Sequence, residues 1–414
     1  MKNIKVNTAD CCATPGLISV DQAIEKILSQ ATAVTETESI DILDALNRVL
    51  AEDLYSSIDV PGYDNSAMDG YAVNSEDCQL TGAKLPVSQR IPAGQVGTAL
   101  RKGDAARIFT GAPIPEGADA VVMQEMCEAD DGSVVINTVV KAESNVRRAG
   151  EDIAQGNVVL SAGKRLRAQE LGLLASVGLA DLKVKRKLKV ATFFTGDEIV
   201  APGQPLKPGQ IYNSNRYTLR GLLQAMDCEI VDLGIVPDTL EATTEVLKQA
   251  AAGADLVITS GGVSVGEEDY VRIALEQLGE LSMWRIAMKP GKPVAFGKVG
   301  NTLFIGLPGN PVSVFVTFLI FARPMILKMQ GVEDYHAKRT SVIADFDWSN
   351  MQRQEYLRVR LHQEEGRSVA SLYPHQGSGV LSSVSWADGL VEMSIGTEIK
   401  KGNVVDYLSF EGLF

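Results

Sequence analysis

The spacing of apolar residues changes along the chain, and each change marks a different kind of structure. Residues 19–22 (Ser-Val-Asp-Gln) match a capping box, and Ala23, Ile24, Ile27 and Leu28 share one face of the helix that follows. A second short helix is predicted over 41–50. From 56 to 144, short alternating apolar runs lie between glycines and prolines, which is typical of a β-rich insert.

Helical spacing returns at 167–178, so we expect 1–55 and 145–182 to form one discontinuous, elongated domain around the insert 56–144. Strands and helices then alternate over 183–330. Strands are predicted at 188–194, 229–235, 256–258, 283–287, 294–296 and 303–306, and helices at 216–226 (N-cap Asn215), 240–252, 270–278 and 311–329. This order predicts an α/β domain whose sheet is mostly parallel, with ligands at the carboxyl ends of its strands. Short strands at 331–414 predict a small β-barrel-like domain.

Composition narrows the class of protein. The chain has 39 basic and 52 acidic residues, a net charge of −13, which disfavours nucleic acid and anionic membranes as partners. The most apolar run, 312–321, is too short to span a bilayer and is predicted to be a buried core helix. The N-terminus lacks the apolar segment of a secretory signal, so a cytoplasmic protein is expected.

Cysteine and histidine usage limits the metal chemistry. The five cysteines show no C-x-x-C spacing, which disfavours a disulfide framework or a zinc site. With only three histidines, any metal is expected to be a hard ion such as Mg²⁺ on carboxylates.

A small-residue loop, 259–266 (TSGGVSVG), follows the strand 256–258. Its glycines expose backbone N–H groups that suit an anion, although an ordinary Gly-rich turn looks the same. The spacing matches neither a P-loop nor a dinucleotide fingerprint. The segment around Ser264 does match the G-x-S-x-G nucleophile elbow, so a serine hydrolase with His336, His362 or His375 stays an alternative. The acids directly behind Ser264 weaken that alternative.

Acidic residues end three of the predicted strands: 267–269 (Glu-Glu-Asp), 197–198 (Asp-Glu) and Asp238. Each alone fits a helix start, where the macrodipole favours acids. Together, beside a basic loop, they indicate a Mg²⁺-phosphate site.

The basic loop is 289–293 (Lys-Pro-Gly-Lys-Pro), and its prolines hold Lys289 and Lys292 on a stiff backbone. Arg285 precedes it on a predicted strand. The segment 307–311 (Leu-Pro-Gly-Asn-Pro) predicts a helix start with an Asn N-cap and Pro at N1, whose free N–H groups can also face an anion.

Seven segments, in this order, resemble the MoeA family of molybdopterin molybdenumtransferases, which includes the gephyrin E domain. They are PGYDNSAMDGYAV, RIFTGAPIPEGADAVV, RRAGED, TGDE, TSGGVSVGEEDY, KPGKP and GLPGNPVS. The resemblance covers residue 18 to the C-terminus. It implies an elongated four-domain homodimer that inserts molybdenum from molybdate into adenylylated molybdopterin, uses Mg²⁺ and releases AMP. It also implies a cleft shared between chains, a molybdopterin adenylyltransferase and molybdoenzyme-delivery proteins as partners, and neither nucleic acid nor membrane.

The resemblance also assigns roles to residues. Those implied to act in catalysis are Asp64, Glu198, Asp238, Asp269, Lys289 and Lys292, and the Mg²⁺ ligands implied are Glu198, Asp238 and Asp269. Those implied to contact the substrate are Thr110, Arg147, Asp152, Gly261, Gly262, Ser264, Arg285, Pro308, Pro311, Arg358 and Ser378. Arg285 stands where the family often has Lys, which keeps the charge and changes its geometry.

Two rival functions are an adenylyltransferase of the same superfamily, which makes the substrate, and a binding scaffold, which is a different class of protein. A single-domain adenylyltransferase lacks the DNSAMDGY insert that this chain carries. A scaffold that has lost catalysis, as gephyrin relatives partly illustrate, has no need of the implied acids and lysines, and their presence favours an enzyme.

Overall fold

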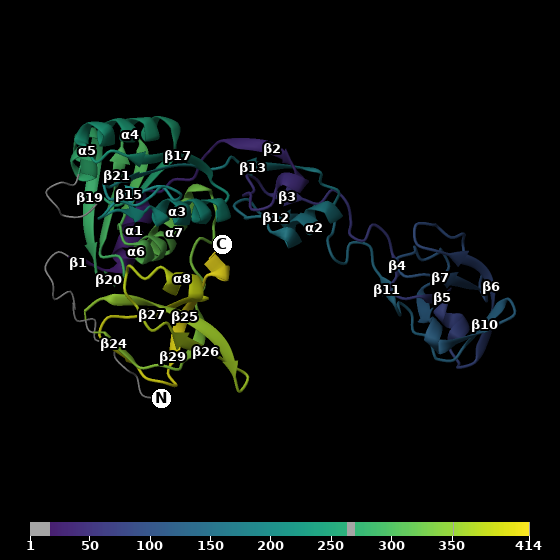
Figure 1. Cartoon of the computed structure of the whole chain (residues 1–414). Coiled ribbons are helices and arrows are strands. Elements are labelled where there is room, and N and C mark those ends of the chain that lie inside the picture. The colour runs from purple at the N-terminus through teal and green to yellow at the C-terminus, as the bar shows by residue number, and fades with distance from the viewer. Residues whose placement is uncertain (1–16, 263–269, 351, 414) are drawn as a thin grey trace. The chain divides into compact units, whose positions relative to one another are not determined.

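The computed structural model describes residues 17–262, 270–350 and 352–413 (Figure 1). The chain divides into two compact units. The first contains Met1–Glu38, Asn47–Val49 and Val184–Phe414, and the second contains Ser39–Leu46 and Leu50–Lys183. Each unit is described by itself below.

A seven-stranded sheet organises the first unit, in the order β1-β19-β21-β22-β18-β14-β17. Its strands are β1 (Leu17–Ile18), β14 (Lys189–Thr195), β17 (Glu229–Val236), β18 (Leu256–Ser260), β19 (Gly279–Ile286), β21 (Pro293–Val299) and β22 (Thr302–Leu307). Strands β22, β18, β14 and β17 run parallel to one another, and β21 is antiparallel to both of its neighbours. The mostly parallel sheet predicted from the alternation is therefore confirmed.

Alternate residues of each strand belong to two different cores. On β18, Leu256 and Ile258 face one core and Val257 faces the other. Helices α4 (Leu240–Gly253) and α5 (Tyr270–Leu278) cover the Val257 face. The opposite face packs against α1 (Val20–Gln30), α3 (Ser214–Ala225) and α6 (Pro311–Thr317) (Figure 1). A strand that is buried on both faces has apolar residues at consecutive positions. This explains why the strands of this sheet appear in the sequence as uninterrupted apolar runs.

Two predicted helix starts have different outcomes. The capping box of α1 is confirmed, since the Ser19 hydroxyl accepts from the Gln22 N–H and the Gln22 side chain accepts from the Ser19 N–H. The predicted N-cap Asn215 of α3 is wrong, because Asn213 occupies that position and accepts from the Arg216 N–H at 3.1 Å.

The predicted helix over 41–50 is also wrong. The structure has a strand, β2 (Thr37–Asp41), followed by one 3-10 turn, η1 (Ile42–Asp44). Asn47 has a φ of 66°, a left-handed conformation that ends helical structure. Strand β2 pairs instead with β13 (Asp181–Lys185).

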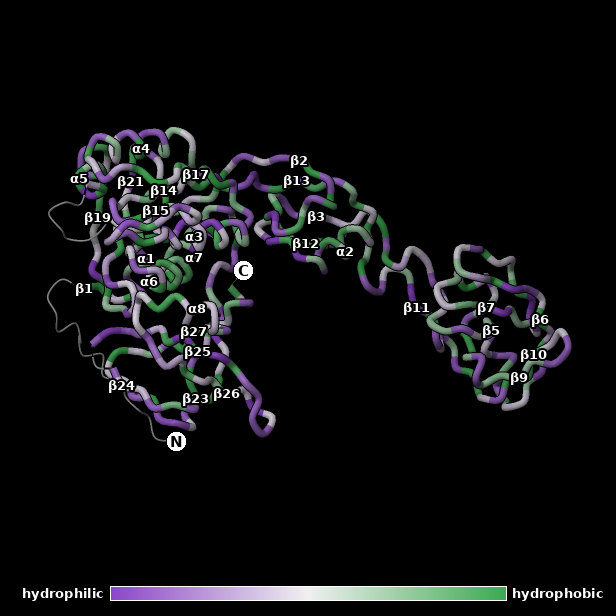
Figure 2. Tube along the Cα trace, in the orientation of Figure 1, coloured by the Kyte–Doolittle hydropathy of each residue, from purple (hydrophilic) through white to green (hydrophobic). Residues whose placement is uncertain are grey.

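The apolar helix is longer than the run 312–321. It continues from α6 through a π-helical turn, η4 (Phe318–Ala322), into α7 (Arg323–Met329). The 19 residues Pro311–Met329 are long and apolar enough to cross a membrane. However, 89% of the most apolar 18-residue stretch within them is buried inside the protein. In Figure 2 this tube is green among other core elements, and the predicted buried core helix is confirmed.

A closed barrel completes the first unit. Its strands are β23 (Thr340–Ala344), β25 (Gln354–Glu364), β26 (Arg367–Leu372), β27 (Gly389–Met393) and β29 (Val404–Ser409). The ladder β25-β26-β23-β29-β27 closes on itself through the β25–β27 pair. A sixth strand, β20 (Met288–Lys289), joins β25 in parallel and so ties the basic loop to the barrel.

The second unit is mainly β structure. Its largest sheet has the order β8-β5-β7-β6-β10-β9. These strands are β5 (Gly70–Val73), β6 (Ala83–Ile91), β7 (Ala105–Ile108), β8 (Ala120–Met123), β9 (Cys127–Asp130) and β10 (Ser133–Ile136). Short pairs β3–β12 (Leu54–Tyr55 with Val158–Leu160) and β4–β11 (Asn65–Ser66 with Val146–Arg147) and helix α2 (Ala168–Ser176) complete it.

Candidate functional site

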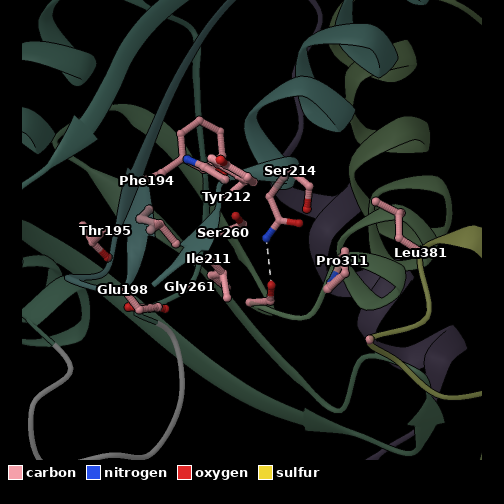
Figure 3. Close-up of a pocket in the computed structure, with 15 residues that line it drawn as sticks. Phe194, Thr195, Glu198, Ile211, Tyr212, Ser214, Ser260, Gly261, Pro311 and Leu381 are labelled. Atoms are coloured by element: carbon pink, nitrogen blue, oxygen red, sulfur yellow. Dashed lines mark hydrogen bonds between the residues drawn. The ribbon is translucent and has the colours of Figure 1, made fainter. Parts of the chain in front are cut away.

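The carboxyl ends of β14 and β18 open into a cavity of about 350 Å³ (Figure 3). Thr195 ends β14, and Ser260 ends β18. The residues that line this cavity are Phe194, Thr195, Glu198, Ile199, Ile211, Tyr212, Asn213, Ser214, Asn215, Ser260, Gly261, Gly309, Pro311, Gly379 and Leu381. The cavity therefore lies where ligands bind in sheets of this type.

A second cavity, of about 740 Å³, shares Glu198, Ile211 and Gly309 with the first. The remaining lining residues are Lys289, Pro290, Gly291, Lys292, Pro293, Pro308, Asn310, Ser313, Arg353, Gln376, Gly377 and Ser378. We call the two cavities together the groove. The basic loop, the start of α6 and a loop that follows the barrel strand β26 thus form one continuous wall.

The charges along the groove favour an anion. Lys289, Lys292 and Arg353 line the larger cavity, and Glu198 is the one carboxylate that lines either cavity among residues 17–262, 270–350 and 352–413. Helix α6 begins at Pro311, directly beside these cations. Within the described lining, three cations and one carboxylate suit a phosphate or oxyanion better than a free cation.

The glycine loop after β18 requires glycine. Gly261 has a φ of +90° and Gly262 of +60°, and a Cβ at Gly262 would lie 2.8 Å from Val271 Cγ2 and 3.0 Å from Thr195 Oγ1. The Gly261 N–H donates to the Leu307 carbonyl at 3.2 Å, so this N–H is already used within the protein. Gly261 nevertheless lines the smaller cavity, so its predicted contact with the substrate stays a prediction.

Three buried polar atoms in the wall of the smaller cavity have no hydrogen-bond partner among the described residues: Asn213 Nδ2, Asn215 Oδ1 and Ser260 Oγ. The amide orientations are set by the other atom of each group. Asn215 Nδ2 donates to the Gly309 carbonyl at 2.7 Å (dashed in Figure 3), and Asn213 Oδ1 accepts the cap bond of α3. Buried polar atoms without hydrogen-bond partners are uncommon in proteins. Three of them around one cavity indicate that this part of the cavity binds a ligand.

The basic loop is held by the barrel. Lys289 Nζ donates to Glu355 Oε1 at 3.0 Å, and Trp348 Nε1 donates to Glu355 Oε2 at 2.6 Å. The Lys289 side chain is 41% exposed, whereas that of Glu355 is 5% exposed. Lys289 therefore lines the groove while its ammonium group is held by the buried Glu355 carboxylate.

The loop that carries Ser378 is held from behind by Arg358. The guanidinium, in a residue that is 1% exposed, donates to the Gly377 carbonyl at 3.2 Å, and Gln376 bonds the Arg358 backbone. Burial lowers the pKa of Arg358 to about 10. Arg358 lines neither cavity, although the resemblance implied substrate contact, while Ser378 does line the groove.

A second group of predicted residues gathers in the second unit. The Asp64 carboxylate accepts a hydrogen bond from the Ala149 N–H at 2.9 Å and forms an ion pair with Arg148. Both contacts lower the pKa of Asp64, and the bond from Ala149 has the larger effect. Asp69 accepts from both the N–H (2.8 Å) and the hydroxyl (2.9 Å) of Thr110, which lowers the pKa of Asp69. Asp64 and Thr110 lie on adjacent loops, since the Ile114 N–H donates to the Asp64 carbonyl.

The other predicted residues lie as follows. Asp238 follows β17 and precedes α4, and Arg285 is exposed on β19; neither lines the groove. Arg147 is exposed on β11, and its neighbour Arg148 makes the contact with Asp64. Exposed Asp152 donates its N–H to the Val60 carbonyl. Ser264 and Asp269, with Glu267 and Glu268, fall outside the described residues.

The described part of the chain contains no group of three or more His, Cys, Asp or Glu side chains placed to hold a metal ion. Of the three implied Mg²⁺ ligands, Glu198 alone lines the groove within that part. The described residues thus do not by themselves form a magnesium site.

Sequence reasoning missed Arg353, Glu355 and Arg148. Arg353 and Glu355 come from the barrel, far along the chain from the basic loop, and no local pattern connects them. Arg148 stands beside the predicted Arg147, and only the side-chain directions distinguish the two.

Comparisons with known proteins cover nearly the whole chain. Residues 18–178 match the family model "MoeA N-terminal region (domain I and II)", 191–328 match "Probable molybdopterin binding domain", and 341–410 match "MoeA C-terminal region (domain IV)". A molybdopterin molybdenumtransferase of Haemophilus influenzae is 46% identical over 320 residues, 77% of this chain and 79% of that protein. Molybdopterin molybdenumtransferase 2 of Mycobacterium tuberculosis is 34% identical over 92% of this chain and 98% of its own length. The crystal structure of a molybdopterin biosynthesis MoeA protein from Pyrococcus horikoshii OT3 has a TM-score of 0.82 at 29% identity, over 95% of this chain and all of that one.

Proposed function

Because the chain belongs to the MoeA family, we propose that it is a molybdopterin molybdenumtransferase that completes molybdenum cofactor biosynthesis. Its substrates are adenylylated molybdopterin and molybdate. Water attacks the phosphoanhydride of the adenylylated substrate, so that AMP leaves and the phosphate stays on molybdopterin. Molybdenum from molybdate is placed on the dithiolene sulfurs, and the displaced molybdate oxygen leaves as water with the thiol protons.

The observation that carries the proposal is the cationic groove at the carboxyl ends of the parallel strands. Anhydride cleavage leaves negative charge on phosphate oxygens, and Lys289, Lys292 and Arg353 line the place where that charge develops. The N-terminus of α6 adds a positive dipole end. These groups stabilise the leaving phosphate without forming a covalent intermediate.

The serine hydrolase alternative loses support from the groove. None of His336, His362 and His375 is among the residues that line the two described cavities, so no imidazole stands ready to act as a base there. A Ser264→Ala variant is expected to keep most of its AMP release. Complete loss of AMP release, with substrate binding retained, would instead favour a nucleophilic serine.

Mg²⁺ dependence is a further part of the proposal. Glu198 contributes one carboxylate to the groove, and the family resemblance adds Asp269 and Asp238 as proposed ligands, of which Asp238 does not line the two cavities. When bound, the ion would supply charge stabilisation to phosphate oxygens. Chelation with EDTA is expected to stop AMP release and added Mg²⁺ to restore it; activity that persists after exhaustive chelation contradicts this part.

We also propose a homodimer in which Asp64 and Thr110 of one chain serve the groove of the other. Exposed apolar side chains beside the smaller cavity support a covered surface there: Ile211 is 57% exposed, Tyr212 45% and Tyr217 54%. Mixing an Asp64→Asn chain with a Lys292→Gln chain should restore part of the activity, because one groove per mixed dimer then has both residues. Two inactive variants that stay inactive on mixing, in a demonstrated mixed dimer, contradict a shared site.

The family resemblance extends the proposal to a cytoplasmic location, to an adenylyltransferase that supplies the substrate and to proteins that deliver the product to molybdoenzymes. The decisive experiment uses purified protein with adenylylated molybdopterin, molybdate and Mg²⁺, and measures AMP. Failure to release AMP, while substrate still binds, would refute the enzymatic function and favour the scaffold.

A further inference from the structure

Glu355 is a buried carboxylate that reaches the groove only through its partners. Its side chain is 5% exposed, and both of its oxygens are engaged, one by the Lys289 ammonium at 3.0 Å and one by the Trp348 indole N–H at 2.6 Å. Glu355 does not line the groove, whereas Lys289 does. A substrate in the groove would therefore meet Lys289 and not Glu355.

The backbone places the two charges opposite each other. Strand β20 pairs in parallel with β25, and Lys289 and Glu355 are register partners in that pair. The Gln354 N–H donates to the Ala287 carbonyl at 2.8 Å, which holds the two strands together just before the charged residues. The ion pair thus follows from the ladder that joins the basic loop to the barrel.

The basic loop is also held from its other side. A Cβ on Gly291 would lie 2.3 Å from Thr317 Cγ2, so the loop backbone packs directly on the helical run that starts with α6. Lys289 therefore sits on a backbone held between the barrel and this helix. With the backbone fixed, only the direction of the long Lys289 side chain remains to be determined.

Two contacts define that direction. The Trp348 N–H keeps the Glu355 carboxylate from rotating, and the Lys289 Nζ lies 5.9 Å from the Trp348 ring centroid. An ammonium has three N–H donors, and the bond to Glu355 uses one of them. The remaining donors are available to phosphate or oxyanion oxygens, with the nitrogen held in one place before substrate arrives.

We propose that Glu355 is a positioning residue for the Lys289 ammonium, with Trp348 orienting the Glu355 carboxylate. The inference rests on the proposed function, because it assigns Glu355 to the same anion-binding groove. Glu355 lowers the net positive charge near the groove and in return holds the Lys289 nitrogen where charge develops. Glu355 thus weakens ground-state anion binding while favouring the transition state.

This balance predicts an unusual kinetic pattern for Glu355→Gln, which keeps an acceptor for Trp348 and removes the charge. We expect kcat for AMP release to fall by about 10- to 100-fold, because the ammonium is no longer held in place. KM should stay the same or fall, and AMP should bind about two- to fivefold more tightly, because Lys289 is less neutralised. Trp348→Phe should change kcat in the same direction by a smaller factor.

Glu392→Gln is the matched control. Glu392 lies on β27, where its side chain is 14% exposed, accepts from Arg339 at 2.7 Å and from Gln354 at 2.5 Å, and lines neither cavity. It should leave kcat and AMP affinity near wild-type values. A Glu355→Gln enzyme with wild-type kcat, or equal losses in both variants, overturns the inference.

A stability cycle tests the pair without any ligand. Lys289→Met leaves the buried Glu355 carboxylate without its cation, so the midpoint of thermal unfolding of this variant should fall. Adding Glu355→Gln to that variant should raise the midpoint again, and simply additive losses overturn the inference. If the wild-type protein releases no AMP, the proposed function fails by itself, and this cycle still decides whether Glu355 acts through Lys289.

Discussion

Replacing Arg358 with Met should separate stability from activity. Arg358 makes three side-chain hydrogen bonds, to Ser383 Oγ at 3.1 Å, to the Tyr356 carbonyl at 3.2 Å and to the Gly377 carbonyl at 3.2 Å. At roughly 1 kcal/mol for each bond, their loss costs about 3 kcal/mol. Met has nearly the volume of Arg, so no large cavity opens.

An opposing effect has a similar size. Burial lowers the pKa of Arg358 to about 10, which shows that its buried charge has an unfavourable environment. At about 1.4 kcal/mol per pKa unit, removal of this charge returns about 3 kcal/mol. The free energy of unfolding of Arg358→Met should therefore lie within about 1 kcal/mol of the wild-type value.

Activity should change far more than stability. Without the Arg358 guanidinium the Gly377 carbonyl loses this hydrogen bond, and the loop that carries Ser378 is then held by the Gln376 bonds to the backbone of residue 358 and by the Val312 N–H bond to the Ser378 carbonyl. We expect AMP release to fall by about tenfold or more. Urea denaturation and AMP release measured on the same preparations test both halves of the expectation.

The neighbouring Arg360 is a suitable control. It is exposed on the same strand and donates to the Trp386 carbonyl at 2.9 Å, and Arg360→Met should leave AMP release close to the wild-type rate. The reasoning is refuted if Arg358→Met keeps full activity. It is also refuted if the variant is destabilised by several kcal/mol, because the charge would then not offset the hydrogen bonds.

Three further predictions concern the glycine loop, pH and the acids. Gly262→Ala should lower the free energy of unfolding by about 2–4 kcal/mol, from both left-handed strain and close contacts, whereas Gly300→Ala, with a φ of +59° and no atom within 4 Å of the added Cβ, should lose only about 1 kcal/mol by urea denaturation. Bonds from Arg167 lower the pKa of buried Glu170 to about 2, so the stability that Glu170 contributes is complete above its unfolded pKa and is lost as pH falls towards 2. Glu170→Gln should flatten that dependence in acid unfolding monitored by circular dichroism, and an unchanged pH profile would count against the assignment. Asp64→Asn and Asp269→Asn should each reduce AMP release far more than thermal stability, and unchanged AMP release in both removes their proposed roles.

Periodicity predicted the elements whose packing follows from local spacing. The alternation on β18 and the helical spacing on α1 are properties of neighbouring residues, so the α/β class and the capping box at Ser19 were predicted correctly. The 41–50 segment has comparable apolar spacing, yet strand pairing with β13 and the left-handed Asn47 prevent a helix. Asn213 caps α3 in place of Asn215 because the chain enters the helix two residues earlier.

The site divides in the same way. The order of loops in the sequence already indicated that Lys289, Lys292, Pro308 and Pro311 meet at the strand ends, and these residues do line the groove. The sequence could not indicate which residues stand behind them. Glu355 lies 66 residues from Lys289 along the chain and meets it because β20 pairs with β25.

The sequence by itself thus determined the type of most elements of the α/β domain and the chemistry available at the strand ends, because side-chain periodicity and turn residues act over a few positions. Only the tertiary structure decided that Arg358 supports the Ser378 loop from behind and that a buried glutamate holds Lys289. Those contacts depend on closure of the barrel and on its pairing with the basic loop. They join segments far apart in the chain, where no local spacing carries information about the partner.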